Sequence, residues 1–320
     1  MKVHAPFLKN LLDYASFQKM DTLALKGLVA NPDIDFNDSD EMVAAEDYVI
    51  VLEKIIEHAK SSYCGLSIGA FLNLSSLGLV LEISLSTSSL RQGIYILEKY
   101  LRHKFPIVSF TIVKDSDSAA LRLESLVENK EVKRELLNMV LYIIYRELKL
   151  MLPSGQAPQI GFPFFKDEET SLFFKEEVFY SADHLLLLPE NYNELEINLN
   201  RVKEIEMLLP KFVSMLNQSD RQAEEFSKNV KGMVLHMCDP EIPNFKQVQK
   251  QFACSERTFQ RRLMAEGTSF RKITNAIKQE LSYYLSNEKY LKTKDIAYIL
   301  GYSESSAYLH ALKEWKNKSE

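Results

Sequence analysis

Three side chains in the last quarter of the sequence have the chemistry to read DNA bases. Arg257, Gln260 and Arg261 are three and four residues apart, so on a helix they lie on one face, one turn apart. Arginine forks onto guanine and glutamine onto adenine in the major groove, which is wide enough to admit an α-helix. A solvated, arginine-rich helix face without a ligand is the alternative that this spacing leaves open.

The helix that carries these side chains also has an apolar back. Phe259 and Leu263, four residues apart, are expected to face inward, and Ser255 is placed to cap the start of the helix. Residues 245–252 predict a short helix ahead of it, and residues 253–254 form the turn between the two. A helix-turn-helix unit of this form places its second helix in the major groove.

The pattern occurs a second time further along the chain. Residues 293–300 predict a short helix that Thr293 caps and Gly301 ends, because glycine readily adopts the positive φ that follows a helix. Residues 304–315 predict the second helix of the pair, with three inward-facing residues, Tyr308, Leu312 and Trp315. Between the pairs, residues 270–285 predict a connecting helix about 24 Å long. Recognition helices held about 34 Å apart by such a connector would reach successive major grooves on one face of the DNA.

Residues 243–315 resemble the DNA-binding domain of the AraC/XylS family of bacterial transcription regulators. The resemblance is carried by the segments 255–263, 266–270, 295–297, 300–303 and 306–308, with Lys313 and Trp315. It implies an all-α domain with two helix-turn-helix units joined by a long helix. It also implies base contacts at seven positions, Arg257, Gln260, Arg261, Ser305, Ser306, Leu309 and His310.

The second unit departs from the pattern of the family. His310 stands where an arginine is usual, Glu314 where a basic residue is common, and Leu312 where a phenylalanine is usual. Histidine lacks the permanent charged fork of arginine, and a glutamate that faces the DNA backbone would repel phosphate. We therefore predict that the first unit dominates DNA affinity. A protein-interaction module whose helix-turn-helix no longer binds DNA is the alternative that these departures support.

Charge is distributed unevenly along the chain. Residues 221–320 contain 17 Lys and Arg against 12 Asp and Glu, a net charge of +5, whereas the preceding 220 residues hold 22 against 32, a net charge of −10. A phosphate backbone would be attracted to the C-terminal part and repelled by the rest. With 320 residues, 46% of them hydrophobic and 26% charged, the chain has the size and composition of a two-domain globular protein.

The N-terminal part mixes helices with short extended segments. Two segments with helical spacing of apolar residues are predicted helices, 41–60 and 131–152. The second is apolar almost all round its middle, which predicts a central position. Ser88 and Ser89 are placed to cap a further helix. Two segments rich in β-branched residues are predicted to pair as a hairpin, 107–113 and 119–126, and shorter extended runs follow within 159–188.

These elements divide the chain into three parts. We predict an α+β domain over residues 1–190, a helical linker over 191–220 and an all-α DNA-binding domain over 221–320. The segments 77–80, 88–93 and 97–101 resemble the N-terminal domain of one branch of the same family, the branch described as arabinose-binding type. That resemblance implies an effector-binding or oligomerisation domain, without implying arabinose as the ligand.

An aromatic-rich segment of the N-terminal part offers either a pocket for an apolar effector or, more commonly, a core. Its members are Phe162, Phe164, Phe165, Phe173, Phe174, Phe179 and Tyr180. No metal site is expected, because His58, His103 and His184 lack a ligand-like spacing with acids or thiols.

Enzymatic chemistry is not expected. Cys64, Cys238 and Cys254 are too scattered for a disulfide framework or a zinc site, and none has the setting of a DNA-repair alkyltransferase, an activity known among relatives of the C-terminal domain. The sequence contains no Gly-rich phosphate loop and no Ser nucleophile elbow. The uncharged stretch between Lys60 and Glu82 is too rich in serine and glycine for a membrane span, and no secretory signal is visible.

Together these features predict a cytoplasmic, sequence-specific DNA-binding transcription regulator with no catalytic residues, no metal and no cofactor. Its expected partners are double-stranded DNA, RNA polymerase, a small-molecule effector and a second copy of the chain, and no membrane.

Overall fold

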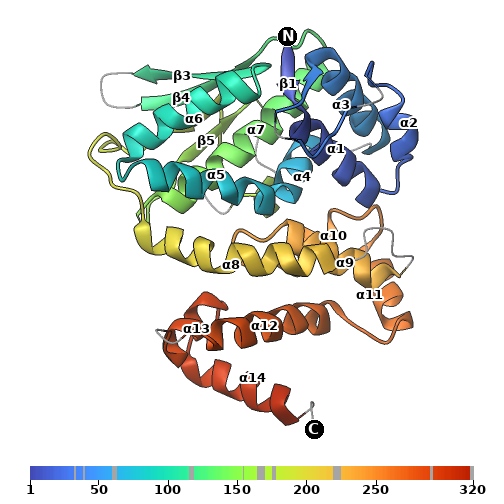
Figure 1. Ribbon diagram of the computed structural model, residues 1–320, viewed down its shortest axis with the longest axis vertical. Helices are drawn as coiled ribbons and strands as arrows, with labels where there is room; N and C mark the ends of the chain where they lie inside the picture. Colours follow the sequence, from blue (N-terminus) through green and yellow to red (C-terminus); the bar gives the residue numbers. More distant parts are fainter. Residues whose placement is uncertain are drawn as a thin grey trace. The chain divides into compact units, whose positions relative to one another are not determined.

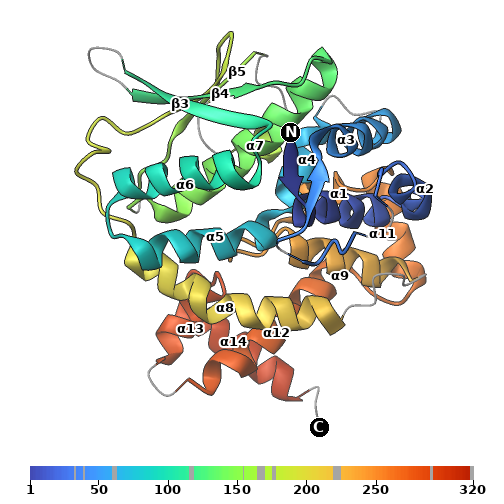
Figure 2. The ribbon, with the colours of Figure 1, turned by 45° about the horizontal axis from the view of Figure 1, so that its top comes forward.

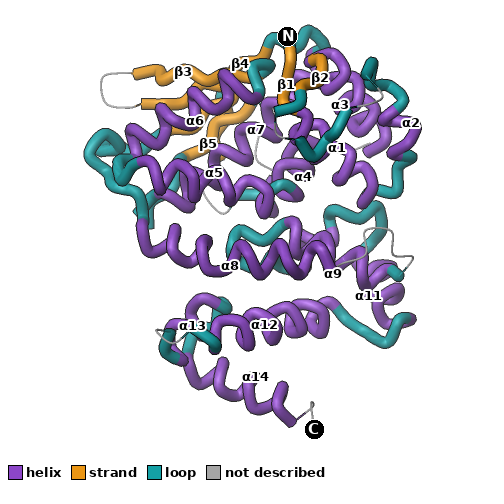
Figure 3. Tube along the Cα trace, viewed as in Figure 1, coloured by secondary structure: helices purple, strands orange, loops and turns teal. Residues whose placement is uncertain are grey.

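Figure 1 shows the fold of the chain as a computed structural model. It describes residues 1–31, 34–38, 40–59, 63–114, 119–153, 155–163, 170–174, 178–218, 225–288 and 291–317. Two compact units are present, Met1–Val202 and Lys203–Glu320. The boundary between them falls inside the segment 191–220. In the described ranges, strands occur only in the first unit, and the second consists of helices and loops (Figure 3).

The first unit contains seven α-helices among its described residues. They are α1 (Ala5–Phe17), α2 (Thr22–Lys26), α3 (Ala45–Ala59), α4 (Cys64–Phe71), α5 (Asn73–Ser86), α6 (Leu90–Lys104) and α7 (Lys130–Met151). The strands are β1 (Lys2–His4), β2 (Met42–Ala44), β3 (Val108–Lys114), β4 (Ala119–Ser125), β5 (Gln159–Phe162), β6 (Val178–Tyr180) and β7 (His184–Leu187), with a short 3₁₀ helix at Thr170–Leu172. This unit is therefore an α+β domain.

The main sheet of the first unit is mixed, with strand order β3-β4-β7-β5-β6. β3 and β4 pair antiparallel, from Val108 opposite Ser125 to Lys114 opposite Ala119, which confirms the predicted hairpin. The residues between these strands, 115–118, lie outside the described ranges. β7 pairs antiparallel with β4 and β5, and β5 pairs parallel with β6.

Helix α7 is the central element of the first unit, as its apolar middle predicts. Asn129 caps it by accepting hydrogen bonds from the backbone N–H groups of Glu131 and Val132. The helix packs on the sheet through β4 and β7, and on α3, α4 and α5 (Figures 1 and 2). The approach of α4 depends on Gly65, because a Cβ atom there would lie 1.9 Å from the carbonyl oxygen of Glu135.

Two predicted boundaries in the first unit are wrong. The helix expected over 41–60 begins at Ala45, because Met42–Ala44 pairs antiparallel with Lys2–His4 as strand β2. The segment 191–220, predicted to be a helical linker, becomes helical only at Leu199, because the backbone of residues 195–197 is extended and bonds to that of residues 88–90. In both cases pairing with a distant segment overrides the local helical spacing. The cap predicted at Ser89 is confirmed, since its hydroxyl accepts from the backbone of Gln92.

The second unit is built around two helix pairs and a connecting helix. Its elements are the C-terminal part of α8 (Leu199–Gln218), then α9 (Phe226–His236), α10 (Phe245–Gln249), α11 (Glu256–Ala265), α12 (Phe270–Ser286), α13 (Thr293–Ile299) and α14 (Ser305–Asn317). Phe259 of α11 lies at the centre of an aromatic core, with the rings of Phe226, Phe245 and Phe252 at centroid distances of 5.0 to 5.6 Å. Tyr308 and Trp315 of α14 are also buried.

One pair of helices bears on the membrane question. In the described ranges, no single helix combines the length and hydropathy that crossing a membrane requires. Helices α4 and α5 reach that hydropathy only as a pair, bent by 62° at their junction.

Candidate nucleic-acid interface and ligand pocket

Helix α11 separates its residues into a buried and an exposed face. Phe259 and Leu263 are buried, whereas Arg257, Gln260 and Arg261 are all exposed. The three polar residues follow the spacing of three and four that places them on one side of a helix. The tertiary structure therefore brings together the first set of residues that the sequence singles out, and presents their side chains to solvent.

The turn before α11 is held by polar contacts at both ends. The hydroxyl of Ser255 accepts a hydrogen bond from the backbone of Thr258, so the predicted cap is confirmed. The side-chain amide of Gln249 donates to the carbonyl of Cys254 at 2.6 Å. Asn244 caps α10 in a capping box with Gln247, and α10 ends at Gln249 rather than at the expected residue 252. These contacts set the direction in which α11 leaves the turn.

The structure places two further side chains of α11 that the sequence analysis did not single out, Met264 and Arg262. Met264 shares the face of Arg257, Gln260 and Arg261, and 72% of it is exposed. Met264 follows Arg257 by seven residues and Arg261 by three, so the sequence spacing already places it on the same helix face. Arg262, by contrast, lies to one side, with its guanidinium 3.8 Å from the ring centroid of Phe226.

The second helix pair, α13 and α14, has no arginine at the positions predicted to contact bases. On α14, Ser306, Leu309 and His310 are exposed and Ser305 is half-buried. Leu309 is 50% exposed, although leucine is an apolar residue. His310 lies beside an acid, with 3.6 Å between its Nδ1 and Oε1 of Glu314. The exposed face of α14 therefore has one fewer permanent positive charge than a family member with arginine at 310, and a carboxylate near it.

The start of α13 is set by a different residue from the one expected, whereas its end follows the prediction. Lys292, not Thr293, is the capping position, because the carboxylate of Asp295 accepts from the backbone N–H of Lys292 at 2.8 Å. Gly301 adopts a φ of +73° just beyond the helix, as predicted, and the backbone of Tyr302 then bonds to the carbonyl of Ala297. Leu312, expected to be buried, is half-buried.

A cavity of about 170 Å³ lies among α1, α3, α5, α6 and α7 of the first unit. Aromatic and aliphatic side chains, including Phe7, Tyr48 and Ile143, form most of its wall. Its polar residues include Glu147, buried on α7, and Glu82, exposed on α5. Figure 2 shows α5, α6 and α7 side by side in this unit.

Glu147 and Tyr100, which both line this cavity, have raised pKa values. Burial raises the pKa of Glu147 to about 8. Burial, followed by the negative charges of Glu147 and Glu82, raises the pKa of Tyr100 to about 12. The effect on Tyr100 shows that the three groups are near enough to interact, which makes this end of the cavity electronegative.

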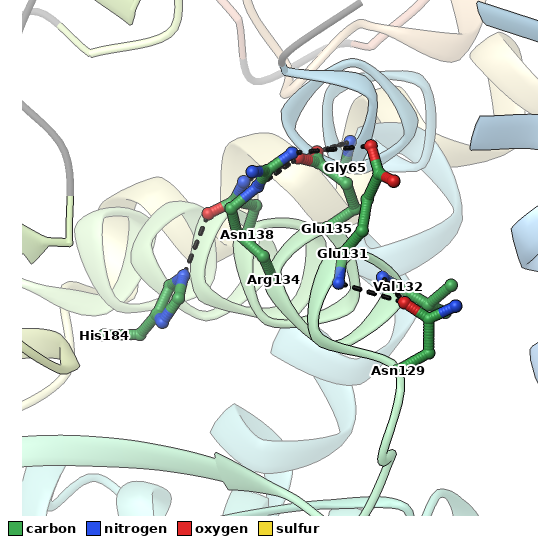
Figure 4. Close-up of polar contacts among 8 residues, drawn as sticks. All are labelled: Gly65, Asn129, Glu131, Val132, Arg134, Glu135, Asn138 and His184. Atoms are coloured by element: carbon green, nitrogen blue, oxygen red, sulfur yellow. Dashed lines mark hydrogen bonds and ion pairs between the residues drawn. The ribbon is translucent and has the colours of Figure 1, made fainter. Parts of the chain in front are cut away.

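A network of buried polar side chains lies along α7 and links this helix to α4 and β7 (Figure 4). Glu135 accepts hydrogen bonds from the backbone of Gly65 at 2.8 Å and from Nε of Arg134 at 2.9 Å. Asn138 contacts Glu135 and also lies 2.9 Å from Nε2 of His184. Burial, with a smaller effect of Arg134, lowers the pKa of His184 to about 4. This network serves packing, since its groups satisfy one another.

The aromatic-rich segment of the first unit is core only in part, since Phe179 is half-buried and Tyr180 is 57% exposed. Phe162, Phe173 and Phe174 are buried, and the rings of Phe162 and Phe174 both pack within the first unit, 5.3 Å apart. None of the described members of that segment lines the cavity. Phe164 and Phe165 lie outside the described residues. In the described ranges, no group of three His, Cys, Asp or Glu residues could hold a metal ion.

The chain is similar to known transcription regulators over most of its length. Residues 26–196, more than half of the chain, match the family described as the arabinose-binding domain of AraC transcription regulators. The ornithine utilization regulator of Pseudomonas aeruginosa is 23% identical over 266 residues, which cover 79% of this chain and 76% of that protein. An HTH-type transcriptional regulator of Mycobacterium bovis is 22% identical over 306 residues, 91% of this chain and 87% of that protein. The HTH-type transcriptional regulator VqsM of Pseudomonas aeruginosa is 32% identical over 79 residues, 25% of this chain and 24% of that protein.

The family match falls on the α+β unit and includes much of the wall of its cavity. The longest of these similarities covers 91% of the chain, so it extends beyond the α+β unit into the helical part that contains α11. The matched family and all three relatives are described as transcription regulators. On this basis the chain belongs to the AraC family of transcription regulators.

Proposed function

We propose that this regulator reads DNA with helices α11 and α14, each acting as the second helix of a helix-turn-helix unit. In the first helix-turn-helix unit, formed by α10 and α11, the base contacts fall on Arg257, Gln260 and Arg261. In the second, formed by α13 and α14, they fall on Ser305, Ser306, Leu309 and His310. The observation that carries the proposal is the exposed face of α11, where two arginines and a glutamine stand over a fully buried apolar back.

The first helix-turn-helix unit, formed by α10 and α11, supplies most of the affinity for DNA in this proposal. Arg257 and Arg261 are permanently charged forks, whereas His310 of α14 lies beside Glu314. Leu309 suits contact with a thymine methyl group, which gives α14 a means of discriminating bases without charge. Met264 adds an apolar contact of the same kind to α11.

Three further parts of the function are proposed with it. Residues 1–190 form the effector-binding or oligomerisation domain, residues 191–220 form the linker and residues 221–320 form the DNA-binding domain. The regulator acts as a homodimer and contacts RNA polymerase. The net charge of +5 in residues 221–320 supports the assignment of DNA to that part.

The test is a gel-shift titration of the full chain on a duplex selected from a random pool. Arg257→Ala, Gln260→Ala and Arg261→Ala are each expected to weaken specific binding about five- to 150-fold and to relax the preference at one base position. Arg262→Ala is the matched control, because it removes the same charge from the same helix while its guanidinium packs on Phe226. It should leave base preference unchanged.

Two outcomes would contradict the proposal. If no duplex is bound at low ionic strength, the chain acts through protein contacts instead, as a module that has lost DNA binding. If Arg262→Ala weakens specific binding as much as Arg257→Ala, the exposed face of α11 does not read bases. Whether the first helix-turn-helix unit dominates DNA affinity is tested separately by footprinting on duplexes with one half-site mutated. Equal losses of affinity from mutation of either half-site would refute that dominance.

A further inference from the structure

Glu147 places a carboxyl group at the cavity of the first unit without a polar partner. The residue is 1% exposed, and neither of its carboxyl oxygens accepts a hydrogen bond from any described residue. A buried polar group left unpaired costs about 1–3 kcal/mol, and more if it is charged. Folded proteins pair nearly all such groups, so an unpaired one that lines a cavity indicates a ligand.

The polar residues of the cavity define the charge of that ligand. Glu82 adds a second carboxylate at an exposed position, and Tyr100 adds a hydroxyl that both carboxylates influence. Among the described residues that line the cavity, none is Lys, Arg or His. A carboxylate or phosphate ligand would meet only like charge here, whereas a cation would gain a partner in Glu147.

The rest of the wall defines the body of the ligand. It is apolar, and it includes the rings of Phe7, Tyr48 and Phe105. Aromatic faces attract an organic cation as well as apolar groups. Apolar cavities of about 150 Å³ hold a benzene-sized molecule, so a cavity of about 170 Å³ suits a body of similar size.

We propose that this cavity binds a small organic amine, with its ammonium group paired to Glu147 and its apolar body among the aromatic and aliphatic side chains. The cation supplies the hydrogen-bond donors that Glu147 lacks within the chain. Glu82 attracts the cation from its exposed position on α5. This site would be the effector site of the first unit, so the inference rests on the effector role proposed above for that unit.

The first experiment compares ligands of one shape and different charge on the full chain. Phenethylamine is the probe, and phenethyl alcohol and 3-phenylpropionate are its neutral and anionic counterparts. Titration calorimetry and thermal unfolding are expected to show saturable binding of the amine and at least tenfold weaker binding of the other two. Absence of binding by phenethylamine and by a shorter amine, butylamine, would overturn the proposal, as would equal binding of the alcohol or the acid.

The second experiment locates the amine with variants. Glu147→Gln keeps the shape of the side chain but cannot ionise to pair with an ammonium group, and is expected to weaken amine binding at least tenfold. Glu82→Gln should weaken it less, and Glu57→Gln on α3, whose side chain is exposed and pairs with Lys54, should not change it. Unchanged affinity in Glu147→Gln would overturn the assignment of the site.

If Glu147→Gln fails to fold, a variant that fills the cavity still tests the proposal. Ser76→Phe places a ring at the cavity from a half-buried position on α5. It is expected to abolish amine binding while the far-ultraviolet circular dichroism stays unchanged. Amine binding needs no DNA, so the two proposals can fail separately. Unchanged DNA binding in Arg257→Ala, with amine binding as proposed, would contradict only the interface. Absence of amine binding in a chain that binds DNA as proposed would contradict only the cavity.

Discussion

The hydroxyl groups of Ser282 and Tyr308 lie 2.7 Å apart in the interior of the second unit. Ser282 belongs to the connecting helix α12 and Tyr308 to α14, and both residues are buried. This hydrogen bond joins the two helices at one turn of each. It therefore sets the rotation of α14 about its own axis, and with it the direction in which Leu309 and His310 face.

Replacement of Tyr308 by phenylalanine tests this coupling. Tyr308→Phe leaves the hydroxyl of Ser282 buried without that partner, so the unfolding free energy should fall by about 1–3 kcal/mol. The double variant Ser282→Ala/Tyr308→Phe should recover part of the loss, since neither partner then remains unpaired. Thermal unfolding measures both. A double variant less stable than Tyr308→Phe would show that the hydrogen bond is not the source of the effect.

Glu266 is expected to stabilise the second unit through the start of α9. Its carboxylate oxygens accept from the backbone N–H groups of Phe226 at 2.7 Å and Ser227 at 2.8 Å. Burial alone would raise the pKa of Glu266, but these hydrogen bonds outweigh it and hold the pKa below its usual value. Glu266→Gln should cost about 0.5–2 kcal/mol at neutral pH, as loss of a helix cap does.

The pH dependence of that loss has a defined sign. A carboxylate whose pKa is lowered by folding stabilises the fold above its unfolded pKa, and the contribution disappears as the pH falls through the folded pKa. The difference between the parent chain and Glu266→Gln should therefore shrink on acidification below about pH 4. A difference that grows in acid would contradict the capping role.

The contact between α4 and α7 leaves no room at Gly65. Gly65→Ala would place a methyl group 1.9 Å from a backbone oxygen of Glu135, and backbone yields less easily than a side chain. We expect a loss of about 3 kcal/mol or more in the unfolding free energy. Gly78→Ala on α5 is the control, because a Cβ there meets no atom within 4 Å and alanine favours the helix. Equal melting temperatures for the two variants would disprove the close contact.

Glu147 should make the first unit less stable as the pH rises. Its pKa is raised by burial to about 8 in the folded state, so between about pH 4.3 and pH 8 the folded chain holds a proton that the unfolded chain has lost. The stabilisation is full below that window and is lost as the pH rises through the folded pKa. Tyr48, Tyr100 and Glu82 are the other ionisable groups that line the cavity, and Tyr100, with its pKa raised to about 12, stays protonated throughout.

Glu147→Gln removes this penalty without changing the shape of the side chain. In the absence of an amine, its unfolding free energy relative to the parent chain should rise between pH 5 and pH 8, by an amount on the order of a few kcal/mol at the upper end, as denaturant unfolding at each pH would measure. Glu57→Gln controls for the loss of an exposed carboxylate. A difference that stays constant across this range would show that Glu147 does not titrate there.

The local sequence alone determined which faces of the helices are buried and where several helices begin and end. Residues three and four apart share a helix face whatever surrounds them, so the exposed set Arg257, Gln260 and Arg261 follows from spacing. The caps at Ser89 and Ser255 and the helix end at Gly301 also follow, because each depends on backbone groups within a few residues.

Only the tertiary structure decided the features that depend on residues far apart in the chain. Strand β2 replaces the first turn of a predicted helix because a segment some 40 residues earlier pairs with it. The cavity draws its wall from five helices, and nothing near Glu147 in the sequence shows that it lacks a partner. Spacing records the neighbours along one helix, whereas burial and hydrogen-bond satisfaction depend on every element packed around it. The sequence therefore indicated the exposed face of α11 that we propose meets DNA, and the fold was needed to reveal the carboxyl group inside.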